Sequence, residues 1–476
     1  MNQAVRIAAE EWRYWSRSKL AAAVAVVMLA LALASAVATW RDITKERNAR
    51  VELQGAAESI FTNQPDRHPH RMVHYGHYVF RAPSPLALID PGVDQFTGTT
   101  VFLEGHRQNS ATFSPAYSGP HGGTFANLSP ATVYQVLIPL MIIVAGFASV
   151  AREQEARTKL LLLTVPVSWR QIWLGKTLAL ASFAAVALLP LLLALLMAQG
   201  DSGAELAMLG GYGVYLMTWV CLVVSVSDRS RTSSWSLMIL LGIWLVVCVA
   251  VPRLASTTAS AVAPLPSKIE TDLAMAEAMR SLGDSHNAAD PAFERLLANL
   301  LIKHGVERVE DLPVNIRGVV AEASEAEQTE VMDRFASEYA QQELEQSRVL
   351  RGSSVLSPML AIQAFSTAMA GTDLAHRHKF LRQAEQSRFE FVQDLNRLHK
   401  TELKYADDIR RSSHADAERR TRVSASNWSR LNAFELEVDP FNERWSRAMP
   451  FFFLMLVFLL AAAALGLLSK RDNEIE

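Results

Sequence analysis

Cysteine is almost absent from this chain. Only two occur among 476 residues, Cys221 and Cys248, and each lies inside an apolar run. Such cysteines are typical of small buried hydrophobic residues, so no disulfide framework supports any part that lies outside a cell. An excess of one charge is also missing, because 46 basic residues are balanced by 48 acidic ones. This balance excludes the basic surface that nucleic-acid binding needs, and we expect no nucleic-acid partner.

The residue patterns of catalytic sites are missing as well. No nucleophile elbow, HExxH helix or pair of carboxylates stands out. Leu174-Gly175-Lys176-Thr177 matches the last residues of a phosphate-binding loop, but Arg170 stands where that loop needs its first glycine. An apolar run follows instead of a strand–loop–helix unit. We therefore expect that the chain is not an enzyme and that it binds no cofactor of its own.

Apolar and charged residues gather in separate blocks. Hydrophobic residues make up 50% of the chain, yet 20% of its residues are charged. Six apolar runs of about 20 residues are long enough to cross the hydrocarbon core of a bilayer. They predict an all-α polytopic membrane protein with six transmembrane helices. We expect the spans at 20–40, 131–150, 174–197, 206–226, 235–251 and 450–468.

The first apolar run has an alternative interpretation. Ala34-Ser35-Ala36 is typical of a signal-peptide cleavage site, but signal peptides have apolar cores of only about 7–15 residues. We therefore expect a span that is not cleaved. Residues 1–19 combine aromatic and basic side chains, which predicts a helix that lies in the membrane interface.

Lysine and arginine counts in the short connections predict which side of the membrane each one faces. The N-terminal arm carries four, the 151–176 connection five and the 228–234 turn two, whereas the 199–205 connection carries none. Basic connections face the cytoplasm. Both termini, including the 469–476 tail with Lys470 and Arg471, are therefore expected in the cytoplasm, as an even number of spans requires.

Two long polar blocks are expected on the opposite side. Residues 41–130 begin as a polar helix and turn into Pro/Gly-punctuated sequence, which predicts a small mixed domain. Residues 254–449 open with a predicted linker at 255–267 and then show the spacing of a large helical domain. The run 355–370 is too short for a seventh span and predicts a core or interfacial helix. Further helices are predicted at 268–282, 291–304, 316–350 and 374–408.

The charged connection 151–173 is the part of the chain best suited to receive force. Its order is a charged opening, a Leu-rich run over 160–163 and a break at Val165-Pro166-Val167-Ser168, followed by Gly175-Lys176. This pattern resembles the first cytoplasmic loop of ABC-2 type transporter permeases. Where that family has Gly before Thr158, this chain has Arg157. The resemblance implies a coupling helix that sits on a separate ATPase subunit.

The resemblance also implies which residues couple the two subunits. We expect Glu153 and Arg157 to contact the ATPase, and Pro166 to set the break in the loop. ATP and Mg²⁺ are then expected to bind in the partner ATPase and not in this chain. The implied coupling residues are Arg152, Glu153, Arg157, Thr158, Pro166 and Ser168.

Two further stretches resemble the ABC-2 permeases that carry a large extracytoplasmic domain, a group often labelled DUF3526. They are His74–Asn109, which begins HYGHYVFRAPSPLALIDP, and Leu356–Leu381, which begins LSPMLAIQAF. The resemblance implies a permease subunit of an ABC exporter in a bacterial inner membrane. Its implied partners are an ATPase dimer, a second permease that is either a copy or a related chain, and the lipid bilayer.

Few polar side chains interrupt the apolar runs. Tyr134, Gln135 and Tyr215 are exceptions, and a polar residue inside a span marks a substrate path by default. Helix–helix packing is the alternative, and we favour it. A lack of buried charge argues against a proton-coupled carrier, so we expect the energy for transport to come from outside the chain.

His68, His70, His74 and His77 lie close together in the first polar block. Imidazoles at such spacing are able to bind zinc or copper. No Cys or acidic ligand is interleaved with them, however, and we favour a polar loop whose histidines cap turns or pair with nearby acids.

Two other classes of function are open at this point. The outer helices of a membrane scaffold or sensor would bind a periplasmic partner and signal inward. A periplasmic metal-handling protein would use the histidines and need the membrane only as an anchor. Six spans are more than an anchor requires.

Overall fold

Six helices are long and apolar enough to cross a membrane in the computed structural model, which describes residues 3–115, 128–158, 167–283, 290–430 and 434–468. The prediction of a six-span, all-α membrane protein is therefore confirmed. The helices are α2 (Lys19–Thr62), the helix Pro130–Glu155, α9 (Trp169–Ala198), α10 (Ser202–Arg229), the helix Ser233–Val262 and α20 (Phe441–Leu467).

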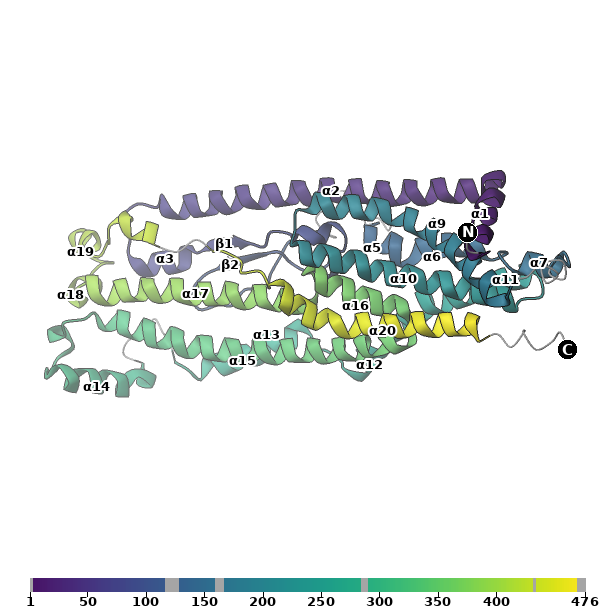
Figure 1. Ribbon diagram of the computed structural model, residues 1–476. Coiled ribbons are helices and arrows are strands. Elements are labelled where there is room, and N and C mark those ends of the chain that lie inside the picture. Colours follow the sequence, from purple (N-terminus) through teal and green to yellow (C-terminus); the bar gives the residue numbers. More distant parts are fainter. Residues whose placement is uncertain (1–2, 116–127, 159–166, 284–289, 431–433, 469–476) are drawn as a thin grey trace.

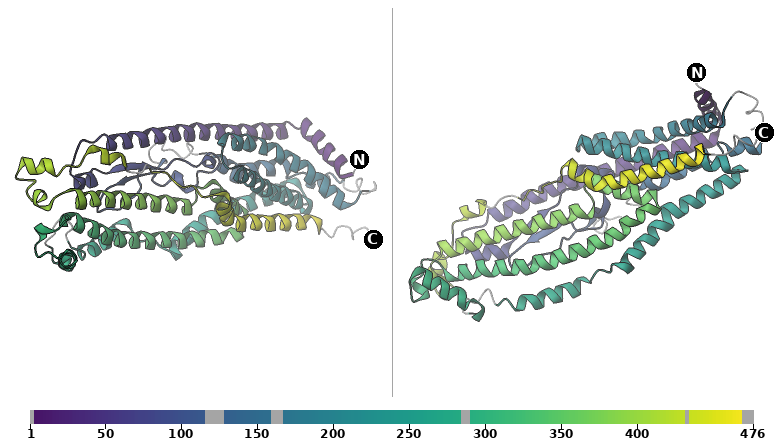
Figure 2. Two further views of the ribbon diagram at one scale, coloured as in Figure 1. Left: turned by 60° about the vertical axis from the view of Figure 1, so that its left-hand side comes forward. Right: turned by 60° about the horizontal axis from the view of Figure 1, so that its bottom comes forward.

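The molecule is elongated, and its two ends differ (Figures 1 and 2). One end, which we call the terminal end, holds α1 (Gln3–Arg17), α7 (Ala151–Glu155) and the last turn of α20. The opposite, distal end holds short helices that belong to the two polar blocks of the sequence. These are α3 (Pro69–Tyr75), α14 (Glu294–His304), α18 (Tyr405–Asp408) and α19 (Ala415–Arg420).

α2 continues without a break from the expected first span, 20–40, through the polar helix expected at the start of 41–130, and ends at Thr62, because the polar residues after the span are also good helix formers. Two other predicted boundaries were wrong. The predicted linker 255–267 is helical up to Val262, because α12 (Val251–Val262) packs against α15 (Ile316–Gly352) and buries Ala255 and Ala259. The predicted helix 374–408 is divided, because α17 (Leu374–Glu402) ends where buried Leu403 takes an extended conformation.

The run 355–370 forms α16 (Pro358–Ala370), a core helix and not a seventh span. Ser357 caps its first turn by accepting a hydrogen bond from the Leu360 amide. The helix lies between α10 and α20, and Phe365 packs over Gly211 of α10, where a Cβ atom would lie only 2.2 Å from the ring. α16 therefore belongs to the same hydrophobic core as the spanning helices.

The distal domain is built around two long helices that run side by side, α15 (Ile316–Gly352) and α17. The small mixed domain predicted for 41–130 contributes α3 and an antiparallel hairpin of β1 (His77–Phe80) and β2 (Thr100–Leu103), in which His77 pairs with Leu103. The hairpin, α3 and the polar half of α2 pack against α17. α13 (Lys268–Arg280) lies along α15.

Candidate functional site

Four helices meet at the terminal end around α7, the first part of the predicted coupling loop. The Ser227 hydroxyl, at the end of α10, accepts hydrogen bonds from the Val150 and Ala151 amides, each at 3.0 Å. The Gln154 side chain donates to the Asp228 carbonyl at 2.6 Å. The Glu155 carboxylate accepts from the Ser233 amide at the start of α11 (Ser233–Leu245). α7 is thus joined to the ends of two spanning helices.

A buried ion cluster attaches α1 to the same junction. Glu11 of α1 is only 2% exposed, and its carboxylate pairs with Arg152 of α7 and, at 2.6 Å, with Lys176 of α9. Lys176 also lies 3.4 Å from Glu153. The guanidinium of Arg152 stacks over the Tyr14 ring. Gly175 and Lys176 therefore take part in the packing of α9 against α1 and α7, and Glu11 is a site residue that the sequence interpretation missed.

The predicted coupling residues divide between inward-facing and outward-facing positions. Glu153 accepts a hydrogen bond from the Thr158 hydroxyl at 2.7 Å and pairs with Lys176, so its carboxylate is used inside the chain. Arg157 is exposed and has a left-handed backbone conformation with φ 57°. Ser168 caps α9 through a capping box with Gln171. Pro166 lies outside the described residues.

The backbone at Arg157 explains why glycine is usual before Thr158 in the family that this loop resembles. A positive φ is easiest for glycine and costs other residues about 1 kcal/mol or more. This chain makes the same turn with arginine, and the turn presents the guanidinium at the surface. Arg157, which stands where the family has glycine, is therefore the most exposed charged residue among the predicted coupling residues.

Gly175 allows α1 to approach α9. A Cβ atom there would lie 2.7 Å from the Ile7 Cβ and 2.8 Å from the Ala4 carbonyl oxygen. We expect Gly175→Ala to lower the free energy of unfolding by about 1–3 kcal/mol, because the backbone of α1 must move. Gly210→Ala is the matched control, since a methyl group at that position would have nothing within 4 Å, and it should stabilise α10 by up to about 1 kcal/mol. Thermal unfolding of both variants in detergent measures these opposite signs, and equal losses would contradict this packing.

Tyr134 and Gln135 of the second span and Tyr215 of α10 are buried in the bundle core. Tyr134 donates to the Ala187 carbonyl, and Tyr215 donates to the Gln135 carbonyl at 2.6 Å. The Gln135 amide donates to the Tyr212 hydroxyl at 3.1 Å and to Asp90 at 3.5 Å. These bonds support the packing interpretation of all three residues.

Asp90 corrects the expectation that the core holds no charge. The residue comes from the first polar block, yet it is only 6% exposed and contacts Gln135 inside the bundle. Burial raises the pKa of its carboxyl group above the ordinary value. A missing buried acid therefore no longer argues against a proton-coupled carrier. Counting charges inside the apolar runs could not detect Asp90, because this residue lies outside them.

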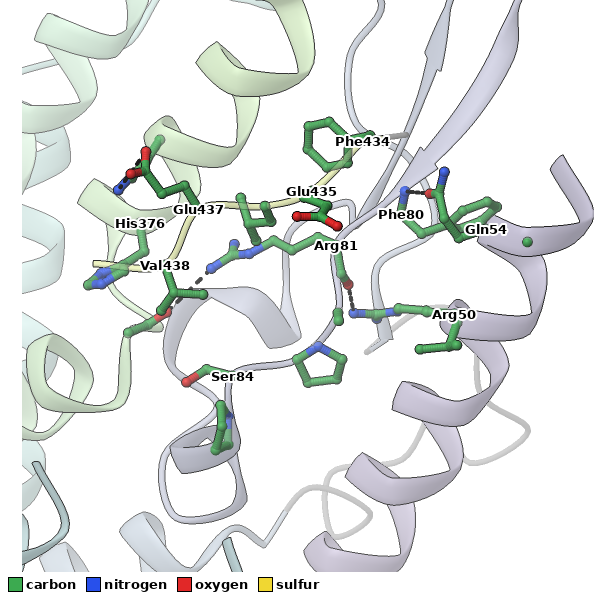
Figure 3. Close-up of a pocket in the computed structure, with 18 of the residues that line it drawn as sticks. Arg50, Gln54, Phe80, Arg81, Ser84, His376, Phe434, Glu435, Glu437 and Val438 are labelled. Atoms are coloured by element: carbon green, nitrogen blue, oxygen red, sulfur yellow. Dashed lines mark hydrogen bonds and ion pairs between the residues drawn. The ribbon is translucent and has the colours of Figure 1, made fainter. Parts of the chain in front are cut away.

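A cavity of about 700 Å³ lies where the spanning bundle meets the distal domain (Figure 3). Arg50 and Gln54 of α2 line one side, and His376 of α17 and the segment 434–438 line the other. Arg81 is held in its wall by Asp94 at 2.7 Å. The volume suits a small molecule. Its lining comes from four segments far apart in the sequence, so no local pattern predicted it.

The four predicted histidines do not form one cluster. His68 turns to Asp408, 3.1 Å away, and packs against the His399 ring. His77 lies between the Phe61 and Phe391 rings. His70 and His74 remain together on α3, where His106 joins them. The favoured interpretation, in which the histidines cap turns or pair with acids, describes His68, which caps α3 and faces Asp408. The alternative of one site built from all four rings is not what the structure brings together, because His68 precedes α3 and His77 begins β1.

Six candidate spans, a charged junction at one end and a folded domain at the other define a multi-pass membrane protein. A family model described as ABC-2 family transporter protein matches residues 5–298, and this chain belongs to that family. A second model, domain of unknown function DUF3526, matches residues 268–437. It includes the predicted stretch Leu356–Leu381 but not His74–Asn109. No curated protein matches the chain. Members of this family are membrane components that associate with an ABC ATPase.

Proposed function

We propose that this chain is the membrane-spanning subunit of an ATP-driven ABC exporter in a bacterial inner membrane. A separate ATPase dimer would bind ATP and Mg²⁺ and dock at the terminal end. The observation that carries this proposal is the α7 junction. An exposed turn at Arg157 stands on a loop that is tied to four helices through hydrogen bonds and ion pairs.

The charges of the terminal end support docking on the cytoplasmic side. Basic side chains are exposed along α1 and around the junction, which fits the positive charge of cytoplasmic loops. An acidic groove on the ATPase would complement them. The exposed basic residues are Arg6, Arg13, Arg17, Lys19, Arg157, Arg170, Arg229 and Arg231.

The contacts of α7 supply a route for movement. When the ATPase closes on ATP, displacement of α7 would be passed to α10 through Ser227, to α11 through Glu155 and to α1 through Arg152. Rigid packing favours movement of these helices together over local bending. In this scheme Arg157 contacts the ATPase, and Glu153 supports the loop from inside the chain.

A second permease, identical or related, would complete the substrate path. Only 11% of the apolar membrane-crossing stretch of the helix Ser233–Val262 is buried in this chain. For α20 the buried share of that stretch is only 17%. These faces are free for lipid or for another permease subunit. A path between two permeases agrees with the packed core around Gln135.

The test is the ATPase activity of the complex that this chain forms with an ABC ATPase co-expressed from the same organism. Arg157→Glu is expected to abolish co-purification and stimulation of the ATPase, because it reverses the charge of the exposed turn while leaving the buried junction intact. Arg280→Glu is the control, since Arg280 is 77% exposed and lies on α13 in the distal domain. Undiminished stimulation by Arg157→Glu would remove this docking site, and failure of the unmodified chain to bind any ATPase would favour the scaffold or sensor.

A further inference from the structure

Three imidazoles from two segments converge at the distal end, where α3 meets the loop after β2. His70 and His74 stand one turn apart on α3, and His106 follows β2. One ligand nitrogen from each ring lies within 4.8 Å of the others. His74 is exposed and the other two are half-buried, so an ion has access from solvent.

The spacing of these nitrogens matches the spacing between two ligands of one metal ion. The Nε2 atoms of His70 and His74 are 3.3 Å apart. Two nitrogens that bind zinc at about 2.0–2.1 Å in tetrahedral geometry lie about 3.3 Å from each other. His70 and His74 are therefore already placed as two corners of such a site, and a small movement of His106 would supply the third.

The third ring is oriented by carboxylate and amide oxygens behind it. His106 Nδ1 lies 3.0 Å from Glu325 and 3.1 Å from the Gln328 side-chain oxygen, and its backbone amide donates to Glu325. Glu325 is in turn paired with buried Arg388. A histidine whose Nδ1–H donates to a carboxylate carries its lone pair on Nε2, which is the usual arrangement around a metal ligand.

We propose that His70, His74 and His106 bind one divalent ion of the borderline class, Zn²⁺ or Cu²⁺. Three neutral imidazoles suit these ions, whereas Mg²⁺ and Ca²⁺ prefer oxygen ligands. The ion ties α3 to the loop after β2, and through Glu325 it fixes both to α15 and α17. The fourth position is open to water or to a ligand side chain of a partner. This inference does not depend on docking of an ATPase.

The experiment is zinc titration of the full chain, purified in detergent without a polyhistidine tag. Competition with a chromogenic chelator is expected to give one Zn²⁺ per chain, with no binding of Mg²⁺. The unfolding temperature should rise by roughly 5 °C at a Zn²⁺ concentration about one hundred times Kd. His74→Ala, an exposed position whose loss leaves the fold intact, should weaken binding by more than about tenfold and remove the thermal shift.

His414→Ala is the matched control, because His414 is exposed at the same end and lies outside the three-histidine group. It should keep both the stoichiometry and the thermal shift. Equal zinc affinity in the unmodified chain and in His74→Ala would overturn the site, as would a thermal shift that His414→Ala loses and His74→Ala keeps. Loss of ATPase stimulation in the Arg157→Glu variant with zinc binding unchanged would separate this site from the docking proposal.

Discussion

Arg388→Met is expected to lower the free energy of unfolding of the distal domain by about 3–5 kcal/mol, the cost of leaving buried carboxylates without their cation. Arg388 is 1% exposed, and Glu325 is 0% exposed. The guanidinium donates to Glu325, to Glu385 at 2.7 Å and to the Thr329 hydroxyl at 2.8 Å. It also donates to the Glu104 carbonyl at 3.3 Å, so that one side chain joins α15, α17 and the loop after β2.

The charges of this group depend on each other. Burial raises the pKa of Glu325, but the hydrogen bond from His106 and the charge of Arg388 outweigh burial and hold that pKa below its ordinary value. Burial dominates at Glu385 and raises its pKa. Without Arg388, both carboxylates would have to take up protons or draw water into the core, and either change opens the contact between α15 and α17.

The measurement is the unfolding temperature of the purified chain, which we expect to fall by roughly 10 °C. Arg397→Met is the matched control on the same helix, because Arg397 is 60% exposed and its ion pairs lie at the surface. That variant should change stability by less than about 1 kcal/mol. Replacing Arg388, Glu325 and Glu385 together with apolar residues should recover much of the loss. Similar effects of Arg388→Met and Arg397→Met would contradict this account of the domain.

Acid is expected to destabilise the distal domain through His77. Burial between the Phe61 and Phe391 rings lowers the pKa of His77 to about 4, against about 6.5 in the unfolded chain. Because the unfolded state binds the proton more readily, the stability that neutral His77 contributes is fully present above about pH 6.5 and is lost as pH falls toward 4. The loss amounts to roughly 3 kcal/mol.

His77→Phe isolates this effect. Phenylalanine keeps the aromatic packing and has no proton to gain, so the variant should lose less stability than the unmodified chain when pH falls from 7 to about 4.5. Thermal unfolding at both pH values gives the comparison. Parallel loss of stability in the two proteins would show that His77 does not titrate in this range.

The spanning helices could be predicted because their signal is local. A run of about 20 apolar residues identifies a span without knowledge of its neighbours. Asp290-Pro291 and Ser357-Pro358 have the residue types that favour a helix start, a capping side chain followed by proline, and both caps form. The predicted linker 255–267 failed because α12 continues to Val262, and hydropathy marks the membrane and not the end of a helix.

The sites could be predicted only in part, because they join segments that are distant in sequence. The charged loop identified α7, but its partner Glu11 lies 141 residues from Arg152. Asp90 reaches Gln135 from outside the apolar runs. His106 joins His70 and His74 only after the hairpin returns the chain to α3. In each case the missing partner comes from tertiary packing, which no residue spacing encodes.

The central claim is that the two ends of the bundle face different compartments, with the Arg157 turn in the cytoplasm and the distal domain outside. Cys221 and Cys248 are buried and replaceable by alanine, so single cysteines at exposed Ala156 and Ser412 report each end. We predict that a membrane-impermeant maleimide labels Ser412→Cys on intact spheroplasts and labels Ala156→Cys only after the membrane is permeabilised. Labelling of both positions from the same side would contradict the account.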